Sequence, residues 1–216
     1  MEIVPGVEIT AEYRERELHL LGYFVRQDDD PLTAALERLR VHRVGRFRDM
    51  VERLRGCGVS LEEEELSTQS EAGTLGRRHL AMLLVESRQA GSVREAFTRY
   101  LADGGRAAVP KLRLPVEEAI ALVRGAGGVA AWAHPSYHCT QESLTELRGW
   151  GLGAVEAEYP AHRPARMRHL RGLAASLGLA VTGGSDCHGD GNLSRAVGAC
   201  GVTGEELERL RQLAGR

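Results

Sequence analysis

The segment GGSDCHGDG, residues 183–191, places a carboxylate and an imidazole two positions apart in a glycine-rich stretch. Asp186 and His188 carry the oxygen and nitrogen donors that bind divalent transition metals. The many glycines make a regular helix or strand unfavourable there. Because two protein ligands do not hold a catalytic metal, further donors must come from elsewhere in the chain.

Three more candidate donors occur in short apolar segments: Glu8 in PGVEIT, His19 in ELHLLGY and His134 in WAHP. A polar side chain in an apolar strand costs free energy unless it finds a partner. Each of these residues alone fits a hydrogen-bonded core residue, whereas five such donors together predict a metal centre. Imidazole and carboxylate ligands suit zinc, manganese or iron, and such centres activate water and bind phosphoryl groups. The glycines of 183–191 would let a metal and a substrate approach the backbone closely.

The first half of the chain contains two expected strands and three expected helices. The strands, residues 2–10 and 17–24, are joined by the charged turn AEYRER. Apolar residues spaced by three, four and eight predict a long amphipathic helix that ends at GCG. The helices are expected over 31–54, 77–89 and 92–105, with Ser92 as the N-cap of the last. A polar break covers 62–73, and residues 107–115 are an expected extended link.

From residue 116 onward, helices and strands alternate with glycine punctuation. The helices are expected over 116–128, 142–151, 166–178 and 205–215, and the strands over 129–135, 154–160 and 180–186. This alternation predicts a parallel β/α sheet or barrel, in which chemistry gathers at the carboxyl ends of the strands. Those ends carry polar side chains: His134, Glu156, Glu158, Asp186 and His188.

The composition limits the classes of protein to consider. The 216 residues, 43% of them hydrophobic, suit one large domain or a domain with an insertion. A net charge of −2 predicts neither nucleic-acid nor membrane binding through bulk charge. The sequence has no apparent leader, and its most apolar stretch is broken by Arg124, so a soluble cytoplasmic protein is expected. Four cysteines without a CxxC pair argue against a zinc knuckle or a redox motif.

Two basic features have alternative interpretations. The helix over 31–54 and the residue after it carry seven arginines, and the interspersed acids favour a solvated face over a surface that tracks phosphates, so no stable DNA-binding surface is predicted. The sequence GRRH, residues 76–79, is either a solvated helix start or an anion site, because arginines at a helix N-terminus oppose the helix dipole. Lys111 is a further, weaker candidate for an anion site.

Six segments in order, PGVEIT, HLLGYF, GRRHLAMLLV, AGGVAAWAHP, GLGAVEAEY and GGSDCHGD, resemble the polymerase and histidinol phosphatase (PHP) superfamily. The resemblance covers nearly the whole chain. Within the superfamily, the chain resembles the stand-alone bacterial branch of nucleoside 3′,5′-bisphosphate phosphatases and 5′-to-3′ RNA exonucleases. It implies an α/β fold, a distorted (β/α)7 barrel over 1–29 and 106–216, and a helical insertion over 30–105. It also implies two or three divalent ions, manganese, zinc or iron.

The resemblance assigns roles to individual residues. Glu8 matches the metal-bridging carboxylate, and four residues match further ligands: His19, His134, Asp186 and His188. Arg77 and His79 match insertion residues that face the substrate, although Arg78 replaces the usual proline. Arg77 or Lys111 would hold a substrate phosphate.

The family's initial HxH strand, a nearby aspartate and a further histidine have no counterpart here. Their two βα units correspond to roughly 60 residues, which favours a truncated chain over a genuinely short product. The expected activity is metal-dependent hydrolysis of phosphate esters in nucleotides or RNA ends. The alternatives are a non-catalytic remnant that binds a nucleotide or a partner, and a metal amidohydrolase, which would lack a strand-end lysine to be carbamylated. The sequence predicts no oligomeric state.

Overall fold

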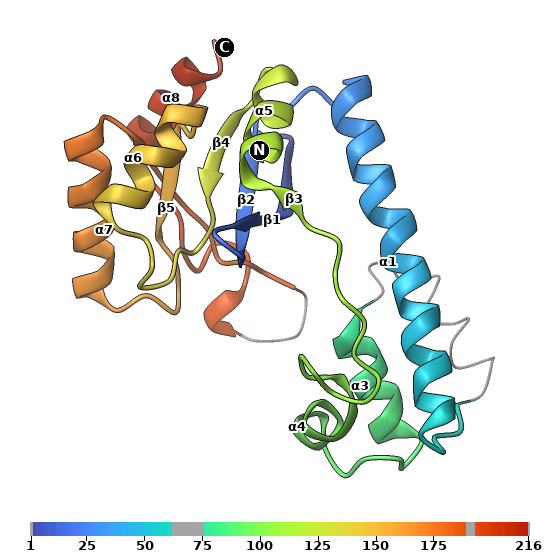
Figure 1. Cartoon of the computed structure of the whole chain (residues 1–216). Coiled ribbons are helices and arrows are strands. Elements are labelled where there is room, and N and C mark those ends of the chain that lie inside the picture. Colours follow the sequence, from blue (N-terminus) through green and yellow to red (C-terminus); the bar gives the residue numbers. More distant parts are fainter. Residues whose placement is uncertain (1, 62–75, 189–192, 216) are drawn as a thin grey trace. The chain divides into compact units, whose positions relative to one another are not determined.

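The computed structural model describes residues 2–61, 76–188 and 193–215 (Figure 1). The chain divides into two compact units, one formed by residues 1–34 with 113–216 and the other by residues 35–112. The polar segment 62–73 and the glycines at 189 and 191 lie outside the described residues. The domain limits drawn from the sequence, 30–105 for the insertion, stay a prediction.

The first unit is built on a six-stranded mixed sheet with the order β3-β1-β2-β4-β5-β6. Its strands are β1 (Gly6–Tyr13), β2 (Arg16–Tyr23), β3 (Leu114–Pro115), β4 (Val129–Trp132), β5 (Ala154–Glu158) and β6 (Ala180–Gly183). Strand β2 runs antiparallel to both β1 and β4, whereas β4, β5 and β6 are mutually parallel. The parallel arrangement predicted for the second half is confirmed.

The β1–β2 hairpin extends closer to its turn than the sequence predicted, and β1 begins at Gly6 instead of residue 2. Strand β1 continues to Tyr13, so the six-residue turn AEYRER was wrong, and the turn consists of Arg14 and Glu15. Both have positive φ, 50° and 63°, as a two-residue turn with the twist of the flanking strands requires. Residues Ala11 and Leu18 are buried on the sheet, which extends the pairing into the charged segment.

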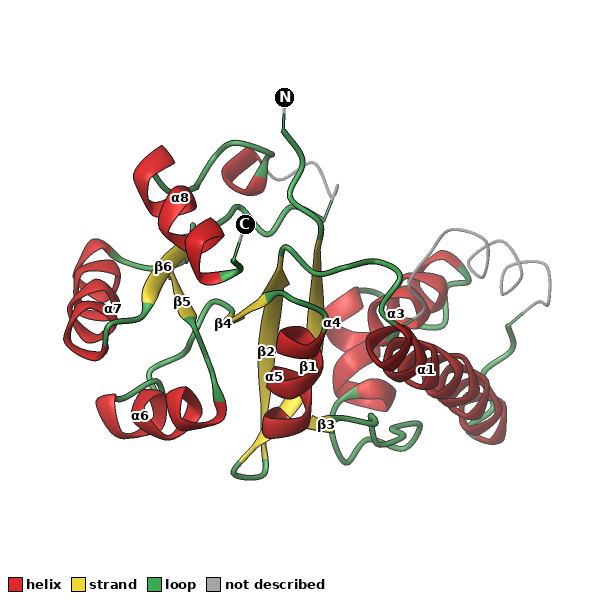
Figure 2. Cartoon of the chain, turned by 90° about the horizontal axis from the view of Figure 1, so that it is seen from above, coloured by secondary structure: helices red, strands yellow, loops and turns green. Residues whose placement is uncertain are grey.

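Helices cover this sheet in the predicted alternation. They are α5 (Val116–Gly125), α6 (Gln141–Trp150), α7 (Pro164–Leu177) and α8 (Gly204–Leu213). Helix α5 contacts β1 and β2, α7 contacts β5, and α8 contacts β6 (Figure 2). Capping boxes begin α6 at Thr140 and α8 at Thr203, and Gly178 ends α7 with φ of 68°. The α/β class predicted from the sequence is confirmed.

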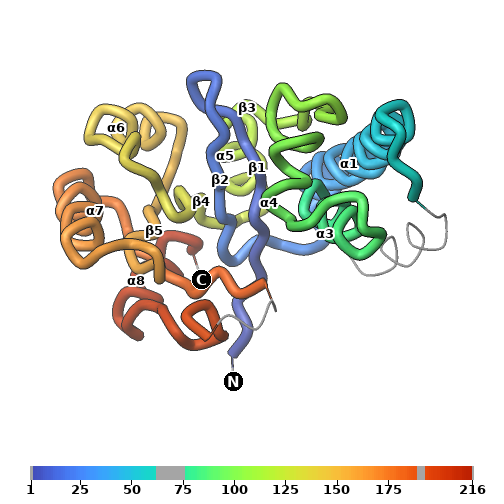
Figure 3. Tube along the Cα trace, turned by 90° about the horizontal axis from the view of Figure 1, so that it is seen from below, coloured from blue at the N-terminus to red at the C-terminus, as the bar shows by residue number. Residues whose placement is uncertain are grey.

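The second unit packs helices around an apolar cluster. Its helices are α1 (Asp30–Gly56), which begins in the first unit, α3 (Arg77–Glu86) and α4 (Val93–Ala96) (Figure 3). Met50 and Leu54 of α1 are fully buried with Leu80 and Leu84 of α3. The Ser92 hydroxyl accepts a hydrogen bond from the Glu95 amide, which confirms the predicted N-cap.

Two details of this unit correct the sequence-based expectations. The helix expected over 92–105 changes after Ala96 into a π-helical turn, Phe97–Leu101, and stops because Ala102 adopts an extended backbone. The arginines of α1 are not a uniformly solvated face. The Arg46 side chain is buried and its Nε donates to the Val109 carbonyl at 2.7 Å, and Arg53 donates to the Ala108 carbonyl.

Among the described helices, none combines the length and apolar character needed to cross a membrane. All four cysteines are free thiols: Cys139 is buried, Cys57 and Cys200 are partly buried, and Cys187 is exposed.

Candidate metal centre

The hairpin register brings Glu8 and His19 together on one face of the sheet. Thr10 lies opposite His19, and Glu8 lies two residues from Thr10, so Glu8 and His19 are diagonal neighbours. The Glu8 Oε1 atom is 2.9 Å from His19 Nδ1 and 3.3 Å from His134 Nε2, which are 3.2 Å from each other. His134 reaches them because it lies two residues after the end of β4, which pairs with β2.

These three donors fit a divalent transition metal. Two ligand atoms bound about 2.1 Å from one tetrahedral ion lie about 3.4 Å apart, close to the separations between these atoms. One carboxylate and two imidazoles are also the donor types that zinc, manganese and iron accept. Among the residues that the structure describes, Glu8, His19 and His134 are the group of three such donors that could hold an ion.

The charges within this cluster are already balanced by its own members. Hydrogen bonds from His134 and His19 lower the pKa of Glu8 well below its usual value. Hydrogen bonds to Glu17 and Glu8 raise the pKa of His19 to about 9. The unliganded cluster is therefore an ion pair between a carboxylate and an imidazolium, and His19 must lose its proton to bind an ion.

Glu17, which the sequence analysis missed, orients His19 from behind. His19 Nε2 lies 3.0 Å from Glu17 Oε1, and Glu17 Oε2 lies 3.2 Å from Arg113 Nε. A histidine ligand typically holds a carboxylate with its second ring nitrogen, which fixes the ring and raises its basicity. The spacing Glu17–x–His19 on one strand was a signal for this, because alternate residues share a face.

Glu156 holds the backbone of His134. Its Oε2 accepts a 2.6 Å hydrogen bond from the His134 amide, and only 4% of the residue is exposed. Burial raises the Glu156 pKa to about 7, although the hydrogen bond from His134 opposes this. The sequence placed Glu156 among the strand-end candidates, and the structure places it as a support for His134.

Asp186 connects to the cluster through Tyr159. Its Oδ2 accepts hydrogen bonds from the Tyr159 hydroxyl at 3.1 Å and from Arg195 Nη1 at 2.8 Å. The Tyr159 ring lies 5.2 Å from the His134 ring between centroids. Sequence analysis missed Tyr159 and Arg195, although Tyr159 directly follows the end of β5, where functional residues of such sheets gather.

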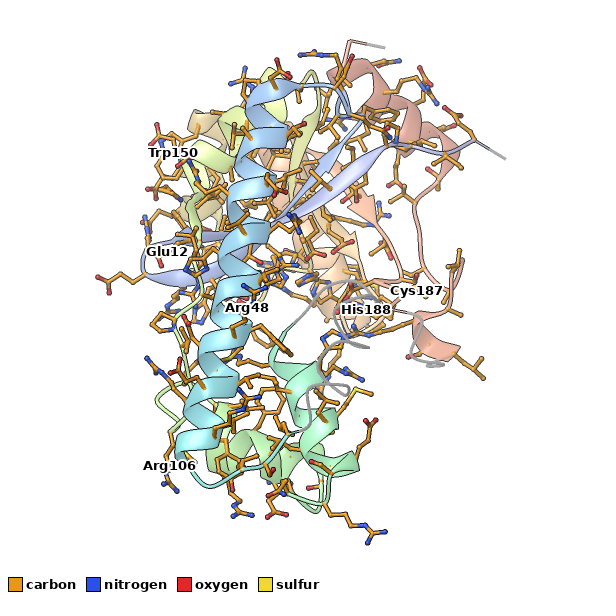
Figure 4. All side chains as sticks on the ribbon, turned by 90° about the vertical axis from the view of Figure 1, so that its right-hand side faces the viewer. Glu12, Arg48, Arg106, Trp150, Cys187 and His188 are labelled. Atoms are coloured by element: carbon orange, nitrogen blue, oxygen red, sulfur yellow. The ribbon has the colours of Figure 1, made fainter. Side chains whose placement is uncertain are left out.

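His188 lies beside Asp186 and is exposed. Its Nδ1 is 3.4 Å from Asp186 Oδ1, and its side chain is 66% exposed. Figure 4 labels it next to Cys187 on the segment that follows β6. The structure thus brings Glu8, His19 and His134 into one cluster and joins Asp186 and His188 to each other near it.

Gly183, the last residue of β6, packs closely against β5. A Cβ atom on Gly183 would lie 2.5 Å from the Glu158 Cβ of β5, so no larger residue fits. The Glu158 carboxylate forms an ion pair with Arg171, with 2.6 Å between Oε1 and Nε. The expectation that the glycines of 183–191 make room for a metal and substrate is therefore corrected at Gly183, where the close neighbour is a strand.

The remaining predicted site residues belong to the second unit. Arg77 Nη1 contacts Asp103 Oδ1 at 2.5 Å and the Leu101 carbonyl at 3.2 Å. The buried His79 Nδ1 has no hydrogen-bond partner within the described part of the chain. Lys111 lies in the extended segment before β3. Their predicted roles toward a substrate stay predictions.

Comparison with known proteins identifies relatives over most of the chain, although no family model matches. The chain is 28% identical to the 5′-3′ exoribonuclease Rnm of Escherichia coli over 87% of its own length, and it spans 66% of that relative. It is 27% identical to a 3′,5′-nucleoside bisphosphate phosphatase of Chromobacterium violaceum, over 89% of the chain and 70% of that protein. A crystal structure assigned as a metal-dependent phosphoesterase from Bifidobacterium adolescentis has a TM-score of 0.84 and 27% identity, and covers 99% of this chain and 78% of its own.

These likenesses support a PHP-like superfamily. The α/β fold and the candidate metal cluster agree with it, since the cluster lies on the strands that the resemblance named.

Proposed function

We propose that this chain is a metal-dependent phosphoesterase that acts on nucleotides or RNA ends. The observation that carries the proposal is the convergence of Glu8 on β1, His19 on β2 and His134, which follows β4, to within 3.3 Å of one another. The relatives named as an exoribonuclease and a nucleoside bisphosphate phosphatase support the substrate class.

The proposed ligands are Glu8, His19, His134, Asp186 and His188, around two or three ions of manganese, zinc or iron. When bound, such ions supply an activated water and stabilise the charge that develops on phosphorus. The chain's own contribution is positioning. Glu17 orients the His19 ring, and Tyr159 with Arg195 holds the Asp186 carboxylate.

The substrate phosphate would be held by cationic residues of the proposed insertion over 30–105 and the link after it, Arg77, His79 and Lys111. The chain spans 66% of the length of the E. coli relative, so the activity of that whole protein comes to this chain only as a proposal.

The test combines metal content with phosphate release. The 216-residue chain is stripped with a chelator and loaded with Mn²⁺, and phosphate release is measured from adenosine 3′,5′-bisphosphate and from a short 5′-phosphorylated RNA. We expect release that depends on the metal, with His134→Ala losing both bound metal and activity. His169→Ala, which changes an exposed histidine of α7, is the matched control and should keep both.

Stoichiometric metal binding without phosphate release from either substrate would overturn the assignment for this chain. Nucleotide binding that survives chelation would instead favour the non-catalytic alternative.

A further inference from the structure

A pocket of about 620 Å³ opens next to the candidate metal centre. His19 and His134 line one part of it, and the hairpin turn together with the segment after β4 lines the rest. The volume lies in the range of sites that hold small molecules such as nucleotides. A ligand that fills the pocket therefore extends from the metal donors to the residues of the hairpin.

Arg16 and His138 meet at the wall of this pocket. Arg16 Nη1 lies 2.7 Å from His138 Nε2, across a separation of 122 residues in sequence. A guanidinium can only donate, so His138 Nε2 is the acceptor and the ring proton resides on Nδ1. Both side chains then present N–H donors, and Arg16 adds a positive charge. This combination recognises a phosphate.

Comparison with the neighbouring Arg14 shows that Arg16 is unusual in lacking a carboxylate partner among the described residues. Arg14 Nη2 is held by two carboxylates, Glu142 at 2.9 Å and Glu146 at 2.5 Å. Arg16, the first residue of β2, is also exposed but has no carboxylate within ion-pair distance among the described residues. Two arginines two positions apart thus differ in whether their charge is already neutralised.

Tyr137 gives the pocket an aromatic wall. Tyr137 is 83% exposed, and the Arg166 guanidinium lies 5.6 Å from the centroid of its ring. A large aromatic residue this exposed in an ordered loop offers a surface on which a nucleobase can stack.

We propose that Arg16 and His138 form an anion subsite that binds a second phosphate of the substrate, while the phosphate to be hydrolysed lies at the Glu8, His19 and His134 cluster. The subsite rests on the proposed function and names the residues that would bind the second phosphate, whether it belongs to a nucleoside bisphosphate or to the next phosphodiester of an RNA end.

The experiment measures binding, so it needs no turnover. Adenosine 3′,5′-bisphosphate, adenosine 5′-monophosphate and the dinucleotide pApA are titrated calorimetrically into the Mn²⁺-loaded 216-residue chain. Arg16→Met is expected to weaken binding of the bisphosphate about tenfold or more, because it removes a charge-assisted contact, and to change binding of the monophosphate by less than about twofold. A matching loss with pApA identifies the phosphodiester of RNA as a ligand of the subsite, and a loss confined to the bisphosphate identifies the nucleoside bisphosphate.

Arg14→Met is the matched control, because its guanidinium is already paired, and it should leave all three affinities within about twofold. Arg16→Lys keeps the charge and should recover part of the affinity, which separates a lost contact from a misfolded protein. Equal losses for monophosphate and bisphosphate in Arg16→Met, or no loss for either, would overturn the subsite. The proposed function fails by a different result, the absence of phosphate release by the unaltered chain.

Discussion

Replacing Glu156 with glutamine should stabilise the metal-free protein at alkaline pH. Glu156 is 4% exposed, and it accepts a hydrogen bond from the His134 amide. Glutamine has nearly the same shape and keeps an oxygen acceptor for this hydrogen bond, but it carries no charge to be desolvated. The change therefore isolates the cost of burying the carboxylate.

The magnitude follows from the shift in the Glu156 pKa, from 4.5 to about 7. The folded protein binds the Glu156 proton more tightly than the unfolded chain does. The contribution of this carboxyl to the free energy of unfolding is therefore fully present below pH 4.5 and is lost as the pH rises through 7. A pKa change of this size corresponds to about 3 kcal/mol in the free energy of unfolding. Relative to the wild type, Glu156→Gln should gain on the order of 2 kcal/mol between about pH 5 and pH 8.

The assay is thermal unfolding at about pH 5 and about pH 8, with a chelator present at both. The difference in melting temperature between Glu156→Gln and the wild type should increase by roughly 4–8 °C at the higher pH. Glu158→Gln, on the same strand, is the control, because its carboxylate is paired with Arg171 and it should show no such gain. A difference that is the same at both pH values would refute the reasoning.

Two further outcomes are expected from the same structure. Mn²⁺ affinity, measured by titration, should rise about tenfold per pH unit from about pH 7 to 9, because His19, with a pKa raised to about 9, must release a proton to bind the ion; a flat profile would exclude His19 as a ligand. Gly183→Ala should lose about 1–3 kcal/mol in urea unfolding, because its Cβ would lie 2.5 Å from that of Glu158. Gly172→Ala on α7, which meets nothing within 4 Å, should instead gain about 0.5–1 kcal/mol.

The parts of the fold that sequence patterns predicted are those with strong local signals. Helices α5 to α8 follow from apolar periodicity with glycine or threonine at their ends, and the parallel order of β4 to β6 follows from their alternation with helices. The π-helical turn at Phe97–Leu101 was not predictable, because its residues have the same apolar spacing as an α-helix. The hairpin turn was misplaced because Arg14 and Glu15 are not the residues that usually adopt positive φ.

Sequence patterns marked the three donors that cluster in the structure, Glu8, His19 and His134, but not the contacts that Glu17, Tyr159 and Arg195 make around them. A histidine or glutamate in an apolar strand is visible in the sequence, because such a residue is costly without a partner. Arg16 and His138 are 122 residues apart, and neither stands in an apolar context that would mark it. Their meeting depends on how the hairpin and the segment after β4 pack, which only the three-dimensional structure shows.

Backbone conformation gives an independent reason to place function at the ends of β4 and β6. His134 lies two residues after β4 and Asp186 three residues after β6, and they have φ of 30° and 51°. A residue other than glycine in this region costs on the order of 1–3 kcal/mol. Hydrogen bonds hold both positions, from the His134 amide to Glu156 and from Tyr159 and Arg195 to Asp186. Glycine at both positions would avoid this backbone strain. The presence of histidine and aspartate there therefore supports a functional role for their side chains.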